Sequence, residues 1–118
     1  KIAANAGAVA FLDIHPHAPG HTVVVPKAHS ASAMSADLDA WAAVFELVRE
    51  IMPRLEKVLG VEGFNVGWND GFAAGQAVDH WHVHILPRYT GDGGGSIHSI
   101  VKNPSTESVE EIYRKYAN

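Results

Sequence analysis

The sequence predicts an α+β fold in which an antiparallel β-sheet packs against one long helix, with a short helix at the C-terminus. Two observations favour this class. Short runs of β-branched residues are joined by turns, and a single long segment carries an apolar stripe with the helical period. Strands and helices do not alternate regularly, so a parallel sheet is not expected. The chain has 118 residues, of which 47% are hydrophobic, and we therefore predict one domain over residues 1–118.

Two strands are predicted near the N-terminus. Residues 8–14 ("AVAFLDI") and 21–26 ("HTVVVP") are short apolar runs, and the segment between them, "HPHAPG", contains two prolines and a glycine. Because proline and glycine mark turns, we expect these strands to lie side by side.

One amphipathic helix is predicted over residues 36–59. Ser35 is expected to cap its N-terminus and Gly60 to end it. Apolar residues recur in this segment at spacings of three and four, which places them on one face of a helix: Leu38, Trp41, Phe45, Val48, Met52, Leu55 and Leu59.

Further elements follow the long helix. We predict a strand over residues 63–69 ("GFNVGWN"), a loop containing glycine over residues 70–79, and a strand over residues 80–88 ("HWHVHILPR") that ends at Pro87. A final helix is expected from about Thr106 to Tyr116.

Composition excludes several classes of function. The formal net charge is −4 and the nine Lys and Arg residues are scattered, so no nucleic-acid polymer is expected as a partner. The chain has no cysteine, which excludes disulfides and thiolate metal sites. No apolar run is long enough to cross a membrane and no signal peptide is recognisable, so we expect a cytoplasmic protein without a membrane partner. A small anionic ligand is compatible with this composition, because backbone N–H groups and histidines can bind one phosphate group.

Three histidines alternate with apolar residues in the predicted strand 80–88. His80, His82 and His84 share one face of a strand, whereas Trp81, Val83 and Ile85 share the other. The apolar set fits a buried face. The histidines can form a polar surface, ligate a metal, or include a nucleophile.

The metal and nucleophile interpretations differ in what they require. Histidines two apart on a strand lie about 6.6–7 Å apart, so three in a row span too far for one tetrahedral ion. A metal would need ligands from elsewhere, and the candidates are His15, His17, His21, His29 and Asp13. A nucleophile requires only a neutral imidazole, which can attack phosphorus without the charge repulsion that a carboxylate meets.

Three segments together resemble a known family. "HWHVHIL" matches the motif His-φ-His-φ-His-φ-φ, with φ apolar, of the histidine-triad (HIT) family of nucleotide hydrolases and transferases. Residues 10–29 ("AFLDIHPHAPGHTVVVPKAH") resemble its nucleotide-binding strands, and residues 69–78 ("NDGFAAGQAV") resemble the loop that leads into the triad. The resemblance implies a HIT-like fold, a homodimer, and hydrolysis of a dinucleoside polyphosphate or an adenosine phosphoramidate with no required cofactor.

The resemblance also implies roles for the histidines. His82 matches the family's nucleophile, which forms a nucleotidyl-histidine intermediate. The backbone carbonyl of His80 is expected to accept a hydrogen bond from the ring of His82, and His84 and His21 are expected to contact phosphate oxygens. His15, His17 and His98 match no family site, and we expect them at the surface.

Other positions match the nucleotide-binding residues of the family. Asp13 is expected at the ribose hydroxyls, and Phe11 and Ile14 at the base; alternatively, Asp13 caps a turn and the two apolar residues belong to the core. Three loop positions are expected to meet the phosphates or the leaving group, with Gln76 also in a catalytic role: Asn69, Gly75 and Gln76.

The chain departs from the family pattern at two points. Ala77 stands where other members carry a serine or threonine whose hydroxyl can help to protonate a leaving group. The Cys-x-x-Cys of many bacterial members is absent, so a structural zinc would depend on His29 and His80 alone. Two alternatives therefore stay open: a nucleotide-binding module whose catalysis has decayed, and a metal-dependent hydrolase that uses the same histidines.

Overall fold

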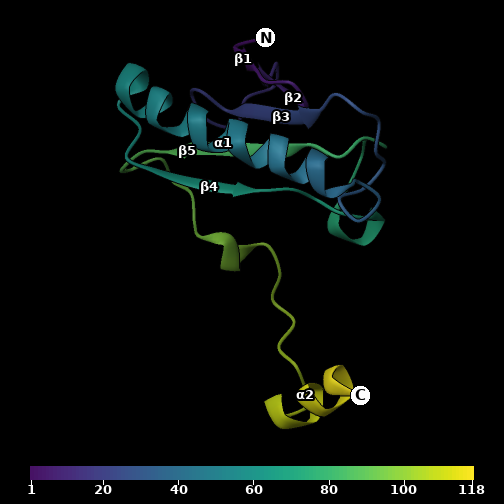
Figure 1. Ribbon diagram of the computed structural model, residues 1–118. Helices are drawn as coiled ribbons and strands as arrows, with labels where there is room; N and C mark the ends of the chain where they lie inside the picture. The colour runs from purple at the N-terminus through teal and green to yellow at the C-terminus, as the bar shows by residue number, and fades with distance from the viewer.

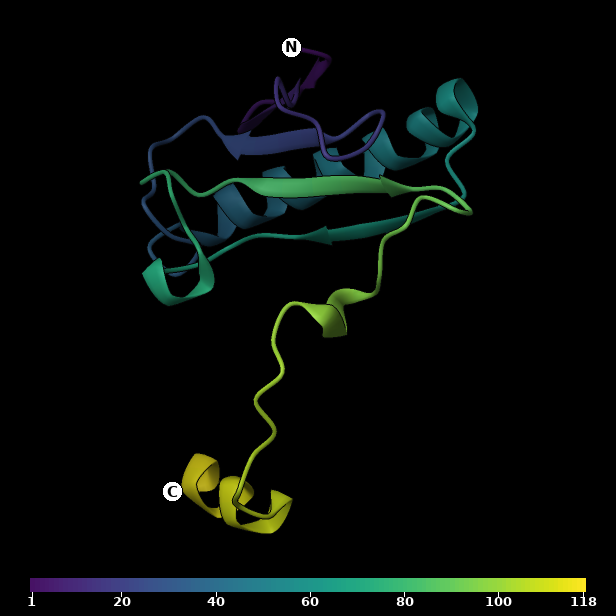
Figure 2. The ribbon, with the colours of Figure 1, turned by 180° about the vertical axis from the view of Figure 1, so that it is seen from behind.

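A computed structural model describes residues 1–118 and contains one five-stranded sheet. Every neighbouring pair of strands is antiparallel, in the order β1-β2-β3-β5-β4. Helix α1 (Leu38–Leu59) lies across one face of the sheet (Figure 1). The view from behind shows the other face without a helix (Figure 2). The predicted α+β class is confirmed. The strands are β1 (Ala3–Ala4), β2 (Ala8–Leu12), β3 (Thr22–Pro26), β4 (Gly63–Gly67) and β5 (Val83–Arg88).

Strand register places one row of residues across the sheet. Phe11 of β2 pairs with Val23 of β3, Val23 pairs with His84 of β5, and His84 pairs with Gly67 of β4. Directly paired residues project on the same face of a sheet. Because His84 lies opposite the face that packs on α1, this row belongs to the open face.

Helix α1 begins two residues later than predicted, and its cap differs. Asp37, not Ser35, is the N-cap, and its carboxylate accepts a hydrogen bond from the backbone N–H of Ala40 at 2.8 Å. The hydroxyl of Ser35 is engaged instead with Ser30 at 2.8 Å and with Ser32, so it is not available to the helix. Gly60 ends the helix with φ 68°, as predicted, in the left-handed conformation that favours glycine.

The hydrophobic core lies between α1 and the sheet. Val44, Leu47 and Ile51 of α1 are buried against the strands, where Val83 and Ile85 of β5 are fully buried. Of the predicted apolar stripe, Val48 and Leu55 are buried in this core, and Trp41, Phe45 and Met52 pack against it. The two ends of the stripe are not removed from water, since Leu38 is 84% and Leu59 44% exposed.

An aromatic cluster surrounds Trp81 at one end of this core. The ring of Trp81 is 1% exposed and lies 5.0 Å from Trp41, 5.8 Å from Trp68 and 6.5 Å from Phe45, measured between ring centroids. The indole N–H of Trp81 is buried without a hydrogen-bond partner. Packing with its aromatic neighbours must therefore outweigh that cost.

The strands are shorter than predicted, and three small elements were not expected. Strand β5 begins at Val83, so His80 and His82 precede it, although the predicted alternation of buried and half-buried residues continues through them. The strand does not end at Pro87, as predicted, but continues to Arg88, which pairs with Gly63. The unexpected elements are β1 and two 3-10 turns, η1 (Phe72–Ala74) and η2 (Ile97–Ser99). Each has three residues or fewer, too short for a periodic signal.

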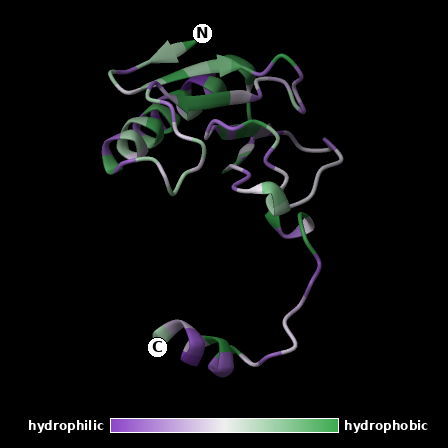
Figure 3. Ribbon diagram, turned by 90° about the vertical axis from the view of Figure 1, so that its right-hand side faces the viewer, coloured by the Kyte–Doolittle hydropathy of each residue, from purple (hydrophilic) through white to green (hydrophobic).

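Helix α2 (Val109–Ala117) stands apart from the sheet at the end of an extended arm (Figures 1 and 3). It begins three residues later than predicted, because Ser108 and Glu111 form a capping box there. None of its residues is buried. No helix of the protein has the length and apolar character needed to cross a bilayer. The structure describes one chain, so the homodimer stays a prediction.

Trp81→Ala is expected to lower the free energy of unfolding by about 3–5 kcal/mol, because the large cavity it leaves cannot collapse fully. Urea denaturation followed by circular dichroism measures this change. Phe72→Ala is the matched control, since Phe72 is 96% exposed, and it should change stability by less than about 0.5 kcal/mol. Equal losses in the two variants would contradict the anchoring role of Trp81.

Candidate active site

Two of the three alternating histidines, His82 and His84, lie side by side on the open face of the sheet. Each is half-buried, whereas Trp81, between His80 and His82, and Val83, between His82 and His84, are buried in the core. The ring centroids of His82 and His84 are 4.9 Å apart. Burial of the intervening residues thus holds these two imidazoles side by side.

A hydrogen bond within the segment determines the tautomer of His82. Its Nδ1 lies 2.8 Å from the backbone carbonyl oxygen of His80, the contact that the family resemblance implies. A carbonyl oxygen can only accept, so Nδ1 carries the proton and Nε2 keeps its lone pair. Neutral His82 therefore presents a nucleophilic nitrogen.

The ring of His80 points to a different part of the protein. Its Nε2 lies 3.3 Å from the backbone carbonyl of Pro26, and the ring packs edge-on against His29 with centroids 5.1 Å apart. His80 thus meets His82 through its backbone, while its side chain packs near the end of β3.

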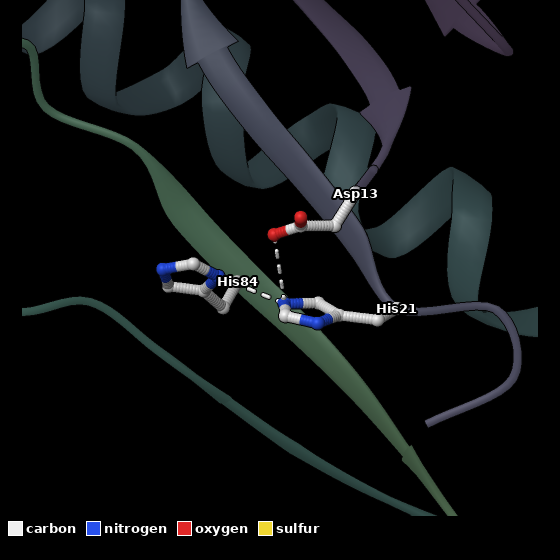
Figure 4. A group of neighbouring side chains, drawn as sticks. All are labelled: Asp13, His21 and His84. Carbon is white, nitrogen blue, oxygen red and sulfur yellow. Dashed lines mark hydrogen bonds and ion pairs between the residues drawn. The ribbon is translucent and has the colours of Figure 1, made fainter. Parts of the chain in front are cut away.

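A chain of hydrogen bonds determines the tautomers of His21 and His84. The backbone N–H of His17 donates to Nδ1 of His21 at 3.1 Å, so the proton of neutral His21 is on Nε2. That Nε2 lies 2.9 Å from Nδ1 of His84 (Figure 4). His84 accepts there and carries its own proton on Nε2, which points away from His21 in Figure 4. This N–H has no partner in the protein and can donate to an anionic oxygen.

Asp13 completes a small group with His21 and His84. One of its carboxylate oxygens lies 3.5 Å from Nε2 of His21 (Figure 4), and the other accepts a hydrogen bond from the backbone N–H of His15 at 2.9 Å. The turn-capping role considered for Asp13 is therefore present. One potential ligand atom from each of the three residues lies within 4.8 Å of the others, so the group could also hold a metal ion.

The electrostatics favour neutral imidazoles beside an ionised carboxylate. Burial lowers the pKa of His21, with the neighbouring His17 also lowering it, although Asp13 acts in the opposite direction. Burial likewise lowers the pKa of His84, and His82 and His21 lower it further. The hydrogen bond from the N–H of His15 lowers the pKa of Asp13 below 3.8. Near neutral pH the group therefore carries one negative charge.

A cavity of about 280 Å³ opens beside these residues, on the β4 side of His84. It is lined by residues 65–69 together with His17, His21, His84 and Leu86. Of the residues expected to bind nucleotide, it thus includes Asn69 and His84. His17 is exposed, as predicted, but it also lines this cavity.

Phe11 and Ile14 lie outside the cavity, on β2 and just beyond it. They are 43% and 86% exposed, so the interpretation that they belong to the core is wrong. Phe11 shares the row of His84, two strands away, and can present its ring to a ligand on the open face.

Gly75 and Gln76 have structural roles within their own loop. Gly75 has φ 90°, which favours glycine. The amide of Gln76 donates to the carbonyls of Ala31 at 2.7 Å and Val78 at 3.0 Å, and accepts from the N–H of Gly71 at 2.8 Å. Gln76 thus holds the loop in place, and neither residue lines the cavity.

Sequence reasoning missed Asn65, Gly67 and Leu86 as residues of the site. Each lines the cavity, and each follows from the pairing of β4 with β5, where Asn65 is opposite Leu86 and Gly67 opposite His84. The alternation of residues 65, 67 and 69 in the predicted strand was a usable signal, because it would place them on one face.

Comparison with known proteins identifies the family. A family model described as the HIT domain matches residues 1–91. The chain belongs to the HIT family. An uncharacterised HIT-like protein of Mycoplasma genitalium is 42% identical to it over 115 residues, which cover 97% of this chain and 79% of that protein. An adenosine 5′-monophosphoramidase of Schizosaccharomyces pombe is 40% identical over 88 residues, which cover 75% of this chain and 63% of the yeast protein.

The fold agrees with solved structures of the HIT family. The crystal structure of a HIT family protein from Bacillus anthracis matches this chain with a TM-score of 0.83 at 31% identity, covering 98% of this chain and 81% of that one. The predicted HIT-like fold is confirmed.

Acidification is expected to destabilise the protein. The folded-state pKa values of His21 and His84 lie below the ordinary value of 6.5, so the unfolded chain binds more protons between the two values. The free energy of unfolding should be largest above about pH 6.5 and fall as the pH drops below that value. Urea denaturation across this range measures the trend, and NMR titration of both rings reports their pKa values.

Asp13 does not titrate in that window, because its pKa lies below 3.8. Ring pKa values at or above 6.5 for both histidines, or a stability that rises on acidification, would contradict the proposed burial of neutral imidazoles.

Proposed function

We propose that the protein hydrolyses a nucleoside phosphate derivative by attack of His82 on phosphorus. The observation that carries the proposal is the hydrogen bond from Nδ1 of His82 to the carbonyl of His80, which leaves Nε2 unprotonated beside His84. An imidazole in this state is a competent nucleophile near neutral pH.

The reaction proceeds in two steps. Nε2 of His82 forms a bond to the α-phosphorus while the bond from phosphorus to the leaving group breaks; the leaving atom keeps the electron pair and takes a proton from water. Water then attacks the nucleotidyl-histidine, the phosphorus–nitrogen bond breaks back to neutral His82, and a nucleoside monophosphate and a proton are released. Splitting the displacement into two steps lowers each barrier.

His84 stabilises the charge that develops on the phosphoryl oxygens. Its Nε2–H is free to donate, because Nδ1 accepts from His21. His21 is buried and 3% exposed, so it holds His84 in that tautomer more than it meets the substrate directly. A preorganised hydrogen-bond donor of this kind stabilises the transition state more than the ground state and therefore lowers the barrier.

The nucleoside is proposed to lie on the β2 side of the histidines. Phe11 and Ile14 offer exposed apolar surface for the base, and the ionised Asp13 suits two ribose hydroxyl donors. An adenosine phosphoramidate and a dinucleoside polyphosphate both fit this assignment, and the relative named as an adenosine 5′-monophosphoramidase supports the former. We place Asn69 near the phosphates and assign Gln76 and Gly75 to shaping the loop beside them.

A metal-dependent hydrolysis is the second candidate, favoured by the close approach of Asp13, His21 and His84. Nε2 of His21 already contacts Nδ1 of His84 and a carboxylate oxygen of Asp13, and a metal would have to replace these contacts. Turnover that survives dialysis against a chelator would exclude this alternative. A nucleotide-binding module with decayed catalysis, motivated by Ala77, would bind nucleotide without releasing product.

His82→Asn is expected to lower kcat by at least about a thousandfold, because it removes the nitrogen that is proposed to form the bond to phosphorus. Release of nucleoside monophosphate from adenosine 5′-phosphoramidate measures the effect, and circular dichroism checks the fold. His98→Asn is the matched control, since His98 is exposed on η2 outside the site, and it should retain full activity. If the folded His82→Asn variant turned over substrate at a rate comparable to that of the wild-type protein, the proposed mechanism would be wrong.

A further inference from the structure

Asn69 and His82, which the proposed reaction uses, lie outside the hydrogen-bonded ladder of the sheet. Strand β4 ends at Gly67 and β5 begins at Val83, and the residues between them, 68–82, form no strand. Ladder bonds hold paired strands in register, so they cannot by themselves fix residues that lie beyond the strand ends. Other contacts must position Asn69 and His82 relative to each other.

The stretch 68–82 is tied to one short piece of backbone, segment 30–33, which lies ahead of α1. Three hydrogen bonds make this link: the N–H of Trp81 to the carbonyl of Ser30 at 2.7 Å, the side-chain amide of Gln76 to the carbonyl of Ala31 at 2.7 Å, and the N–H of Ala33 to the carboxylate of Asp70 at 2.9 Å. In Figure 1 the loop 70–79 lies beside the chain that leads into α1.

Segment 30–33 is itself anchored in the core. Ser30 and Ala33 are 7% and 3% exposed. The carbonyl of Ala33 accepts a hydrogen bond from the indole N–H of Trp41, on α1, at 2.9 Å. Because close-packed core residues move little, this segment can serve as a fixed support for the loop.

Asp70 provides the link that lies next to Asn69. Its carboxylate makes this one hydrogen bond, to an N–H that is 37 residues away in the sequence. Gln76 differs, because its amide also bonds to Gly71 and Val78 within its own loop. A short side chain with an ionised acceptor makes a strong and well-directed bond. The bond of Asp70 therefore fixes the backbone at the point where Asn69 joins the loop.

We propose that Asp70 is a positioning residue: through its bond to the N–H of Ala33 it holds Asn69 and the loop 70–79 in the geometry that attack by His82 requires. The inference rests on the proposed function of His82. Without the bond, Asn69 and the phosphate near it can shift relative to Nε2 of His82, and a misplacement of about 1 Å can slow a reaction about a hundredfold. The nucleoside contacts proposed beside β2 do not depend on this bond, so substrate binding changes less than the rate.

The test compares three substitutions of Asp70, with adenosine 5′-phosphoramidate as the substrate. Asp70→Ala removes the acceptor and should lower kcat by at least about tenfold, with KM within about threefold of the wild-type value. Asp70→Asn loses the charge but keeps an oxygen that can accept from the same N–H, so its kcat should stay within about threefold of wild type. Asp70→Glu keeps the charge on a side chain one methylene longer, and its kcat should fall as in the alanine variant.

Asp37→Ala is the matched control. The carboxylate of Asp37 also accepts from a backbone N–H, that of Ala40 at 2.8 Å, but it caps α1 and takes no part in the proposed reaction. Losing this cap should lower the urea midpoint of unfolding, while kcat per folded molecule stays within about twofold of wild type. Circular dichroism gives the folded fraction of every variant, so a loss of stability is separated from a loss of positioning.

The outcomes separate this inference from the proposed function. The positioning role would be overturned, and the role of His82 left intact, by a kcat of folded Asp70→Ala within about twofold of wild type, or by an equal fall in kcat in Asp70→Asn or Asp37→Ala. If Asp70→Ala does not fold, equal kcat values in Asp70→Asn and Asp70→Glu would overturn it. Failure of the wild-type protein to release adenosine monophosphate from the phosphoramidate would overturn the proposed function, and the positioning role with it.

Discussion

The site depends on the alternation of side chains from residue 80 to residue 88. Trp81, Val83 and Ile85 are buried against α1, and their burial forces the histidines between them onto the open face. The hydrophobic effect therefore sets the direction of the histidine side chains, because turning any one of them toward the core would expose a large apolar neighbour to water. The half-buried imidazoles need no further scaffold than the strand itself and the aromatic cluster that holds Trp81.

Hydrogen bonds then give identical side chains different chemistry. The carbonyl of His80 makes His82 a lone-pair donor at Nε2, whereas the sequence of bonds from the N–H of His17 through His21 makes His84 a hydrogen-bond donor at its own Nε2. Burial keeps His21 and His84 neutral, which preserves these tautomers. The proposed nucleophile and the proposed oxyanion donor therefore differ in chemistry but not in residue type, although their ring centroids are only 4.9 Å apart.

Much of this arrangement could be predicted from the sequence because it is local. The faces of residues 80–85 and the stripe of α1 follow from periods of two and 3.6 residues. The cap of α1 could not be predicted, because Ser30, Ser32 and Ser35 bond to one another and leave Asp37 free for the helix. The pairing of Gly67 with His84 joins residues from two strands across a loop, and the position of α2 depends on an arm that makes few contacts with the sheet. A short sequence pattern cannot predict such contacts between residues that are far apart in the chain.

The central claim is that Nε2 of His82 bonds to phosphorus during turnover. Rapid quenching during hydrolysis of adenosine 5′-phosphoramidate, followed by intact mass measurement and peptide mapping, tests it most directly. The account predicts a transient adduct with the mass of one adenylyl group, located on His82 within residues 80–88 and absent at the end of the reaction. Steady turnover with no adduct at any quench time, or an adduct on another residue, would contradict it.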